Sequence, residues 1–244
     1  MSKRKNVKYF MILIAICSFS LADNLPQSFK NYTKYTLKND MGMALYLAPS
    51  LSKNAKKIHI KGNNYSSPKN SIKFGLQDRF VEISFSRGDS DDFNFEFRFS
   101  DIDYEENEAL SIYADVLFVS ANGFVYTKNT ANEYFPKFQK FKLQGNTAKE
   151  IQQAFYKVNI PCKTSALTHF YSQKCKGGKR VATLAKNTPV KILLADNTNA
   201  CPNERNSKEY LVETSFGLLG WVSSRGGYGQ RLGNPLGCLM FNGD

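Results

Sequence analysis

Histidine is almost absent from this chain of 244 residues, in which only His59 and His169 occur. The motifs G-x-S-x-G, H-E-x-x-H and the P-loop are absent too, which excludes the common signatures of serine hydrolases, zinc proteases and nucleotide hydrolases. Both histidines lie in strand-like segments, where a surface or packing role is the ordinary one. We therefore expect a protein that is not an enzyme, with no catalytic residue, no metal and no cofactor.

Long apolar sequence is also lacking at the N-terminus, where MILIAIC is far shorter than the ~20 residues of a membrane-spanning helix. Four basic residues and no acid precede it, and Ser20 and Ala22 are the small residues that a signal peptidase reads. We expect residues 1–22 to be a cleavable signal peptide and the protein to be periplasmic. The alternatives are an uncleaved anchor and a lipoprotein attached through Cys17, although an isoleucine precedes this cysteine where lipoproteins have a small residue.

Acidic residues are fewer than basic ones, with 21 Asp and Glu against 33 Lys and Arg, and the formal net charge is +12. Loss of residues 1–22 removes four positive charges and no negative ones, which leaves +8. Such a charge favours contact with anionic partners, among them phospholipid headgroups, wall polymers and acidic proteins. The basic residues are scattered, so we expect no nucleic-acid partner. The basic charge permits peripheral contact with a membrane.

Close cysteine pairs of the C-x-x-C kind, which zinc sites use, are missing as well. The four cysteines that remain after cleavage are spaced by 13, 26 and 37 residues; they are Cys162, Cys175, Cys201 and Cys238. An even number in an exported protein predicts two disulfides, with three possible connectivities.

Acidic residues do gather in two places, and these raise two further alternatives. The clusters are Asp89, Asp91 and Asp92, and Asp101, Asp103, Glu105, Glu106 and Glu108. Paired carboxylates can cleave glycans, and DIDYEENEA could hold calcium, but Glu106 stands where an EF-hand loop requires glycine. We expect both clusters to be solvated turns.

Strand patterns dominate residues 23–159, which we expect to form a β-rich N-terminal domain. RFVEISFS (79–86) and FNFEFRFS (93–100) alternate apolar and polar residues around a turn-forming RGDSDD, and this predicts a hairpin. The other candidate strands are residues 43–48, 56–62, 71–76, 109–120, 123–128 and 140–144. Residues 146–159 carry a capping box and an apolar face at helical spacing, so we expect one closing helix there.

The C-terminal residues 160–230 show a second set of short strands. ALTHFYS (166–172) is followed by the turn and strand of LAKNTPVKILLA (184–195), then by Tyr210-Leu211-Val212 and Gly220-Trp221-Val222 on either side of a tight turn at Gly217. This order resembles the bacterial SH3 domain, a five-stranded β-barrel of exported bacterial proteins. The chain departs from the family pattern in having Tyr210 where a tryptophan is frequent, and in a longer loop around Cys201.

The resemblance implies a mainly β protein whose second domain is a small SH3-like barrel, with a tail, residues 231–244, stapled by Cys238. In such a barrel the two chain ends meet, which favours a Cys162–Cys238 disulfide, and two loops flank one groove, which favours Cys175–Cys201. The groove-lining candidates are Phe170, Tyr171, Tyr210 and Tyr228, although some of these aromatic residues can equally be core. Trp221, Val222 and Leu211 are the expected structural core.

The function that the resemblance implies is recognition of cell-wall peptidoglycan or of an envelope protein. The alternatives are a periplasmic inhibitor or immunity protein acting on a wall-degrading enzyme, and a wall hydrolase whose catalytic domain is residues 24–155. A weak internal similarity between residues 43–62 and 165–187 also leaves two related β modules in tandem as an alternative organisation.

Overall fold

The computed structural model describes residues 26–36, 43–59, 70–87, 93–103, 108–196, 201, 207–225 and 234–242. The expected signal peptide, residues 1–22, lies outside them. The chain divides after Lys30 into two units, of which the first contains the 3-10 helix η1 (Gln27–Phe29) and the second contains all the strands. Strands far outnumber helices, so the predicted mainly β class is confirmed. In the part of the chain that the structure describes, no helix is long and apolar enough to cross a membrane.

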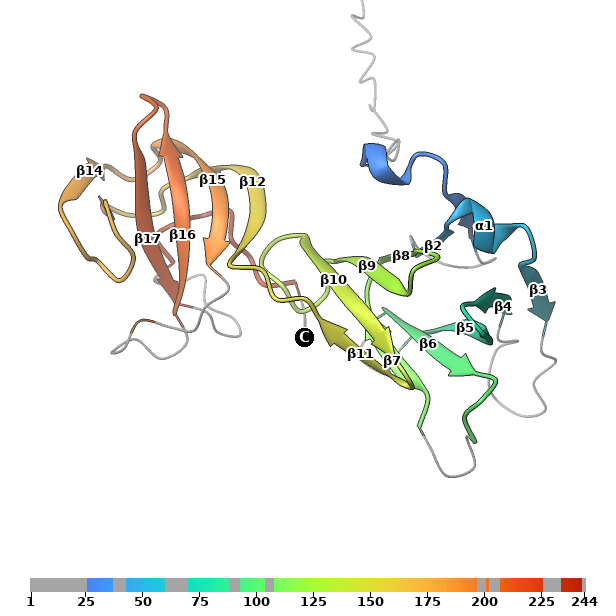
Figure 1. The fold of residues 1–244 in the computed structure, drawn as a ribbon. Helices are drawn as coiled ribbons and strands as arrows, with labels where there is room; N and C mark the ends of the chain where they lie inside the picture. Colours follow the sequence, from blue (N-terminus) through green and yellow to red (C-terminus); the bar gives the residue numbers. More distant parts are fainter. Residues whose placement is uncertain are drawn as a thin grey trace, which may run out of the picture. The chain divides into compact units, whose positions relative to one another are not determined.

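Two sheets form from residues 33–150 (Figure 1). In the first sheet, the strand order is β1 (Thr33–Tyr35), β2 (Ala44–Leu47), β8 (Val116–Val119), β9 (Phe124–Asn129), β10 (Lys137–Gln144) and β11 (Thr147–Glu150). The second sheet is a meander of β3 (Lys56–His59), β4 (Asn70–Leu76), β5 (Arg79–Arg87), β6 (Phe93–Phe99) and β7 (Leu110–Tyr113). A short helix, α1 (Pro49–Ser52), follows β2.

One hydrophobic core joins these two sheets. The predicted hairpin of β5 and β6 is present, and alternation turns Phe95, Phe97 and Phe99 to the same buried face. Leu45 from β2 and Leu117 from β8 belong to the same core. Strands β2 and β8 pair in parallel, and the whole second sheet lies between them in the sequence, since parallel neighbours need a long crossover.

The predicted helix over residues 146–159 is wrong, because this segment forms β11 and the first part of β12 (Phe155–Lys163). Gly145 and Asn146 form a two-residue loop between Gln144 and Thr147, and Gly145 has φ +58°, as in a type II′ hairpin turn. The tight turn and the pairing of β11 with β10 therefore outweigh the helical spacing of the apolar residues.

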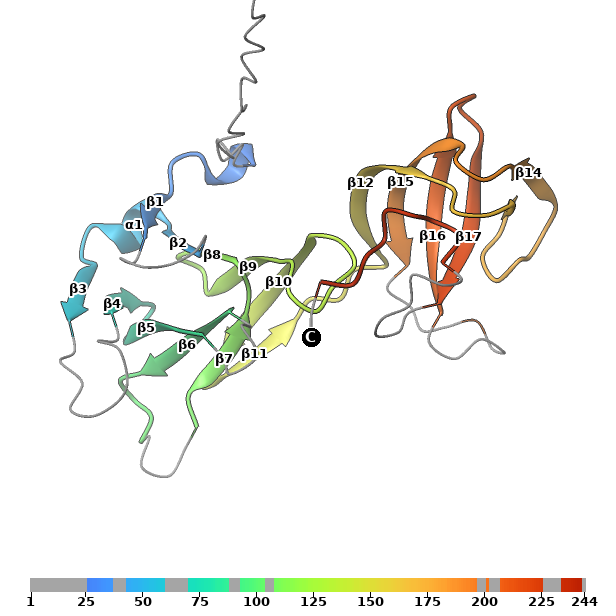
Figure 2. The same cartoon turned by 180° about the vertical axis from the view of Figure 1, so that it is seen from behind.

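Residues 155–225 form a third sheet, seen from both sides in Figures 1 and 2. The strand order is β12, β15 (Pro189–Asp196), β16 (Ser207–Thr214), β17 (Leu219–Arg225), β13 (Thr168–Tyr171) and β14 (Arg180–Leu184). All its pairings are antiparallel. The sequence-derived boundary between residues 159 and 160 falls inside β12, which pairs with β15 from Phe155 onward.

The third sheet has its own core, to which distant segments contribute. Phe135, from the loop before β10, packs against Tyr210, and Leu236 and Leu239 from the C-terminal tail are buried in the same cluster. Cys162 and Cys238 form one disulfide, and Cys175 and Cys201 form the other. These are the two pairs that the resemblance favours. Two disulfides indicate an oxidising, extracytoplasmic compartment.

Candidate functional site

Strand alternation divides the residues predicted to bind a ligand between the two faces of the third sheet. Phe170 and Tyr210 are 0% and 1% exposed, so both belong to the core and cannot line a groove. Burial raises the pKa of the Tyr210 phenol, with smaller contributions from Tyr134 and Glu133, so this side chain stays neutral at physiological pH. Tyr171 is partly exposed and remains a candidate, whereas Tyr228 lies outside the described residues.

The predicted structural core needs the matching correction. Val222 is buried in the second core, but Trp221 and Leu211 are only partly buried and are not members of that cluster. The reason is the period of two in a strand: Tyr210, Val212 and Val222 point inward, and their sequence neighbours point to the other face.

On that outer face, directly paired residues form one lateral row across all six strands. The strand register places Lys157, Leu194, Leu211, Trp221, Tyr171 and Arg180 side by side in this order. The solvent face of a small antiparallel sheet is ordinarily polar. Here the four central positions are apolar or aromatic, and the two ends of the row are cationic. These four side chains are partly buried, and an apolar row that keeps part of its surface exposed on an outer face is a candidate binding surface.

A further aromatic ring and an ion pair lie beside this row at Trp221. The ring of Phe155, which is 39% exposed, lies 5.8 Å from that of Trp221 at an interplanar angle of 38°. Lys174 Nζ lies 5.7 Å from the centre of Phe155 and 5.9 Å from that of Trp221. The same ammonium is 2.6 Å from the buried carboxylate of Asp196. We call Phe155, Tyr171, Lys174, Asp196 and Trp221 the Trp221 site.

The Cys175–Cys201 disulfide holds the loop that presents Lys174. This loop is closed by backbone hydrogen bonds from Ser172 to Lys179 and from Gly177 to Lys174. Cys175 and Lys176 have φ angles of +60° and +57°. This left-handed backbone conformation is unfavourable for residues with a side chain and persists only where the surroundings stabilise it. The disulfide to Cys201 supplies that support, so the position of Lys174 depends on a covalent link.

Glu209 is the buried acidic group beside this disulfide. It is 5% exposed, its Oε1 accepts a hydrogen bond from Ser223 and lies 3.3 Å from Cys201 Sγ, and its Oε2 has no partner among the described residues. The ligand atoms of Cys175, Cys201 and Glu209 lie within 4.8 Å of one another. Both sulfurs are joined in the disulfide, however, and a metal requires thiolates.

Gly220 makes the close approach of β17 to β13 possible. A Cβ at this position would lie 2.7 Å from Phe170 Cβ. We expect Gly220→Ala to lower the free energy of unfolding by about 1–3 kcal/mol, the usual effect of overpacking a core. Urea denaturation measures the change. Gly75→Ala is the matched control, since Gly75 also lies in a strand and nothing comes within 4 Å of the position that a Cβ would take there; equal loss in both variants would contradict this account.

A separate hollow lies beside the other disulfide. Its volume is about 580 Å³, and its lining includes Lys163, Thr164, Lys186 and the Cys162–Cys238 pair. None of the residues predicted to bind a ligand lines it. Of the predicted acidic clusters, the described Asp101 pairs with Arg79 at 3.5 Å, whereas Asp89, Asp91, Asp92, Glu105 and Glu106 lie outside the described residues.

Three residues of the Trp221 site are not found by sequence reasoning. Phe155 falls within the segment expected to be a helix, Lys174 lies in the loop that contains Cys175, and Asp196 is the last residue of β15. The available signal is the pair Cys175–Cys201, because the expected disulfide brings Cys201 next to the residue that follows Lys174. Comparisons with family models, with curated proteins and with solved structures found no match to the chain.

Proposed function

We propose that the protein is a non-catalytic, periplasmic binding protein that recognises peptidoglycan through the Trp221 site. The observation that carries the proposal is the apolar and aromatic row on the outer face of the third sheet, with the Lys174–Asp196 pair beside it. Aromatic rings offer apolar area to the C–H faces of sugar rings, and adjacent charged groups can bond to hydroxyl and amide groups.

Three further points support the assignment. The resemblance of residues 160–230 to bacterial SH3 domains suggests cell-wall material as the ligand class. The disulfides and the expected signal peptide, residues 1–22, suit the periplasm. His169 Nδ1 lies 3.0 Å from the Thr183 hydroxyl on the neighbouring strand, which suits a packing role rather than a catalytic one.

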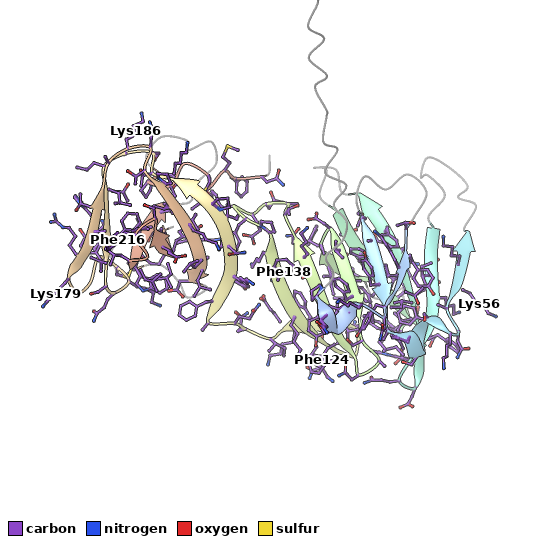
Figure 3. All side chains as sticks on the ribbon, turned by 90° about the horizontal axis from the view of Figure 1, so that it is seen from above. Lys56, Phe124, Phe138, Lys179, Lys186 and Phe216 are labelled. Carbon is purple, nitrogen blue, oxygen red and sulfur yellow. A yellow bond between two sulfur atoms is a disulfide. The ribbon has the colours of Figure 1, made fainter. Side chains whose placement is uncertain are left out.

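Trp221→Ala tests the proposal by sedimentation of the protein with purified sacculi. We expect the affinity to fall about 30-fold, as on removal of an aromatic hot spot, while the free energy of unfolding falls by only about 1 kcal/mol. Phe216→Ala is the control, because Phe216 is 87% exposed at the tip of the β16–β17 hairpin, outside the row (Figure 3).

Unchanged sacculus binding by Trp221→Ala would exclude the Trp221 site. Loss of wild-type binding at about 0.5 M salt would show that the interaction is charge attraction alone, because screening at that ionic strength acts within a few ångströms. Capture of one stoichiometric envelope protein without sacculus binding would favour the inhibitor alternative. Clearing in a peptidoglycan zymogram would contradict a non-catalytic role.

A further inference from the structure

A charged surface lies on the first sheet, on the face opposite its core. The register places Tyr126 beside Lys140, Phe124 beside Lys142 and Lys128 beside Phe138 on β9 and β10. The same face continues to the exposed Lys149 on β11. On the other side the register runs through Phe118 and Tyr46, which are buried, to the exposed Lys34 on β1. We define the lysine face by its five cations: Lys34, Lys128, Lys140, Lys142 and Lys149.

Aromatic rings hold two of these cations, Lys140 and Lys142, close to the sheet. Lys140 Nζ lies 4.1 Å from the ring centre of Phe124 and 5.4 Å from that of Tyr126, and Lys142 Nζ lies 4.5 Å from that of Phe124. Cation–π contacts of this kind orient an ammonium group without neutralising it. The positive charge of these two lysines therefore stays available to an anionic partner.

Acidic side chains are absent from this face in the described strands β1, β2, β8, β9, β10 and β11. The residues that share the face on β9 and β10 are aromatic, lysine or glutamine. Lys137 on β10 forms an ion pair with Glu133, but strand alternation places Lys137 on the opposite face of the sheet. The face thus carries five positive charges on a chain that is already basic.

Exposed apolar side chains lie next to the lysines, and they favour an anionic bilayer over a hydrophilic polyanion as the partner. Phe138 is 50% exposed on this face, and Ile151, whose backbone N–H donates to the Lys140 carbonyl, is 42% exposed. A hydrophilic polyanion offers such side chains no apolar contact. The headgroup region of a bilayer accepts both lysine and aromatic or aliphatic side chains, and β9, β10 and β11 present both kinds on one face.

We propose that the lysine face docks the protein on an anionic phospholipid bilayer, with Phe138 and Ile151 entering the headgroup region. This contact uses the first sheet and is independent of the Trp221 site on the third. It gives the protein two ligands of different chemistry, one at the membrane surface and one in the wall.

The test is co-sedimentation of the full chain with large vesicles of phosphatidylglycerol and phosphatidylcholine, or of phosphatidylcholine alone. The variant Lys128→Gln/Lys140→Gln/Lys142→Gln should bind the anionic vesicles about 100-fold more weakly than the wild type. Wild-type binding to phosphatidylcholine alone at equal affinity would overturn the proposal.

The matched control is Lys56→Gln/Lys179→Gln/Lys186→Gln, which removes the same charge from exposed lysines elsewhere on the chain (Figure 3). We expect this variant to bind within about threefold of the wild type, since charge far from the contact acts only through the screened field. Equal loss in both triple variants would mean that net charge alone is responsible, and would overturn the assignment to this face.

Phe138→Ser separates a bilayer from a soluble polyanion. We expect it to weaken vesicle binding about tenfold, because the side chain leaves the headgroup region, and to leave binding to heparin unchanged. Vesicle binding unaffected by Phe138→Ser and fully competed by heparin would overturn the bilayer in favour of a polyanion. Thermal melting of each variant establishes that it is folded; should the triple variant fail to fold, the single substitution Lys140→Gln serves, with an expected loss of about fivefold.

Discussion

Alanine at both Cys162 and Cys238 is expected to lower the free energy of unfolding of the third sheet and its core by about 4.5 kcal/mol. The disulfide closes a loop with a sequence separation of 76, so the unfolded chain gains much conformational freedom when the link is lost. The link also places the tail that buries Leu236 and Leu239. Urea denaturation of the variant and the wild type, each purified with its remaining cysteines fully oxidised, measures the difference.

The other disulfide provides the comparison. Cys175 and Cys201 are separated by 26 residues, for which the same chain-entropy argument gives about 3.5 kcal/mol. We therefore expect Cys162→Ala/Cys238→Ala to be the less stable of the two double variants. The opposite order would show that the loops around the Trp221 site, and not closure of the larger ring, limit the stability.

Phe170→Ala should lower the free energy of unfolding by about 3–5 kcal/mol, the second large effect that the structure predicts. Phe170 is 0% exposed, and the backbone of Gly220 packs directly against it, so truncation leaves a cavity that neighbouring strands cannot readily fill. Thermal and urea denaturation, followed by far-ultraviolet circular dichroism, measure the loss.

Tyr171→Ala is the control for Phe170→Ala on the same strand. Tyr171 points to the outer face and pairs with Trp221, so its removal should cost about 1 kcal/mol or less and should weaken sacculus binding instead. Similar destabilisation by both substitutions would contradict the division of β13 into a core face and an outer face.

The strands are predictable because their alternation is a local property of the sequence. Residues 79–86 and 93–100 carry the pattern clearly, and the structure pairs them as expected. Residues 109–120, a single candidate strand, form β7 and β8 instead, because the chain leaves one sheet for the other at Ala114 and Asp115. Nothing in the local pattern marks that crossing, which depends on the partner strands.

The site is predictable only in part. The resemblance assigns roles to residues by their place in a motif, whereas the alternation of each strand decides which face of the sheet a residue occupies. Phe170 and Tyr210 are expected at a groove and lie in the core, whereas Trp221 is expected in the core and lies on the outer face. The period of two separates Tyr210 from Leu211, but it cannot say which face is covered. That depends on Phe135, Leu236 and Leu239, which lie far away in the sequence.

The parallel pairing of β2 with β8 has a consequence for the order in which the chain folds. Each strand of the meander β3–β7 pairs with its sequence neighbour, so these strands meet through short loop closures. Ala44, by contrast, pairs with Val116, which lies far along the chain. Closing so long a loop is slow, so we expect this contact to form after the meander. A chain threaded N-terminus first through a translocation pore would therefore expose Leu45 and Leu47 until β8 emerged. That interval is when a chaperone would have the most to protect.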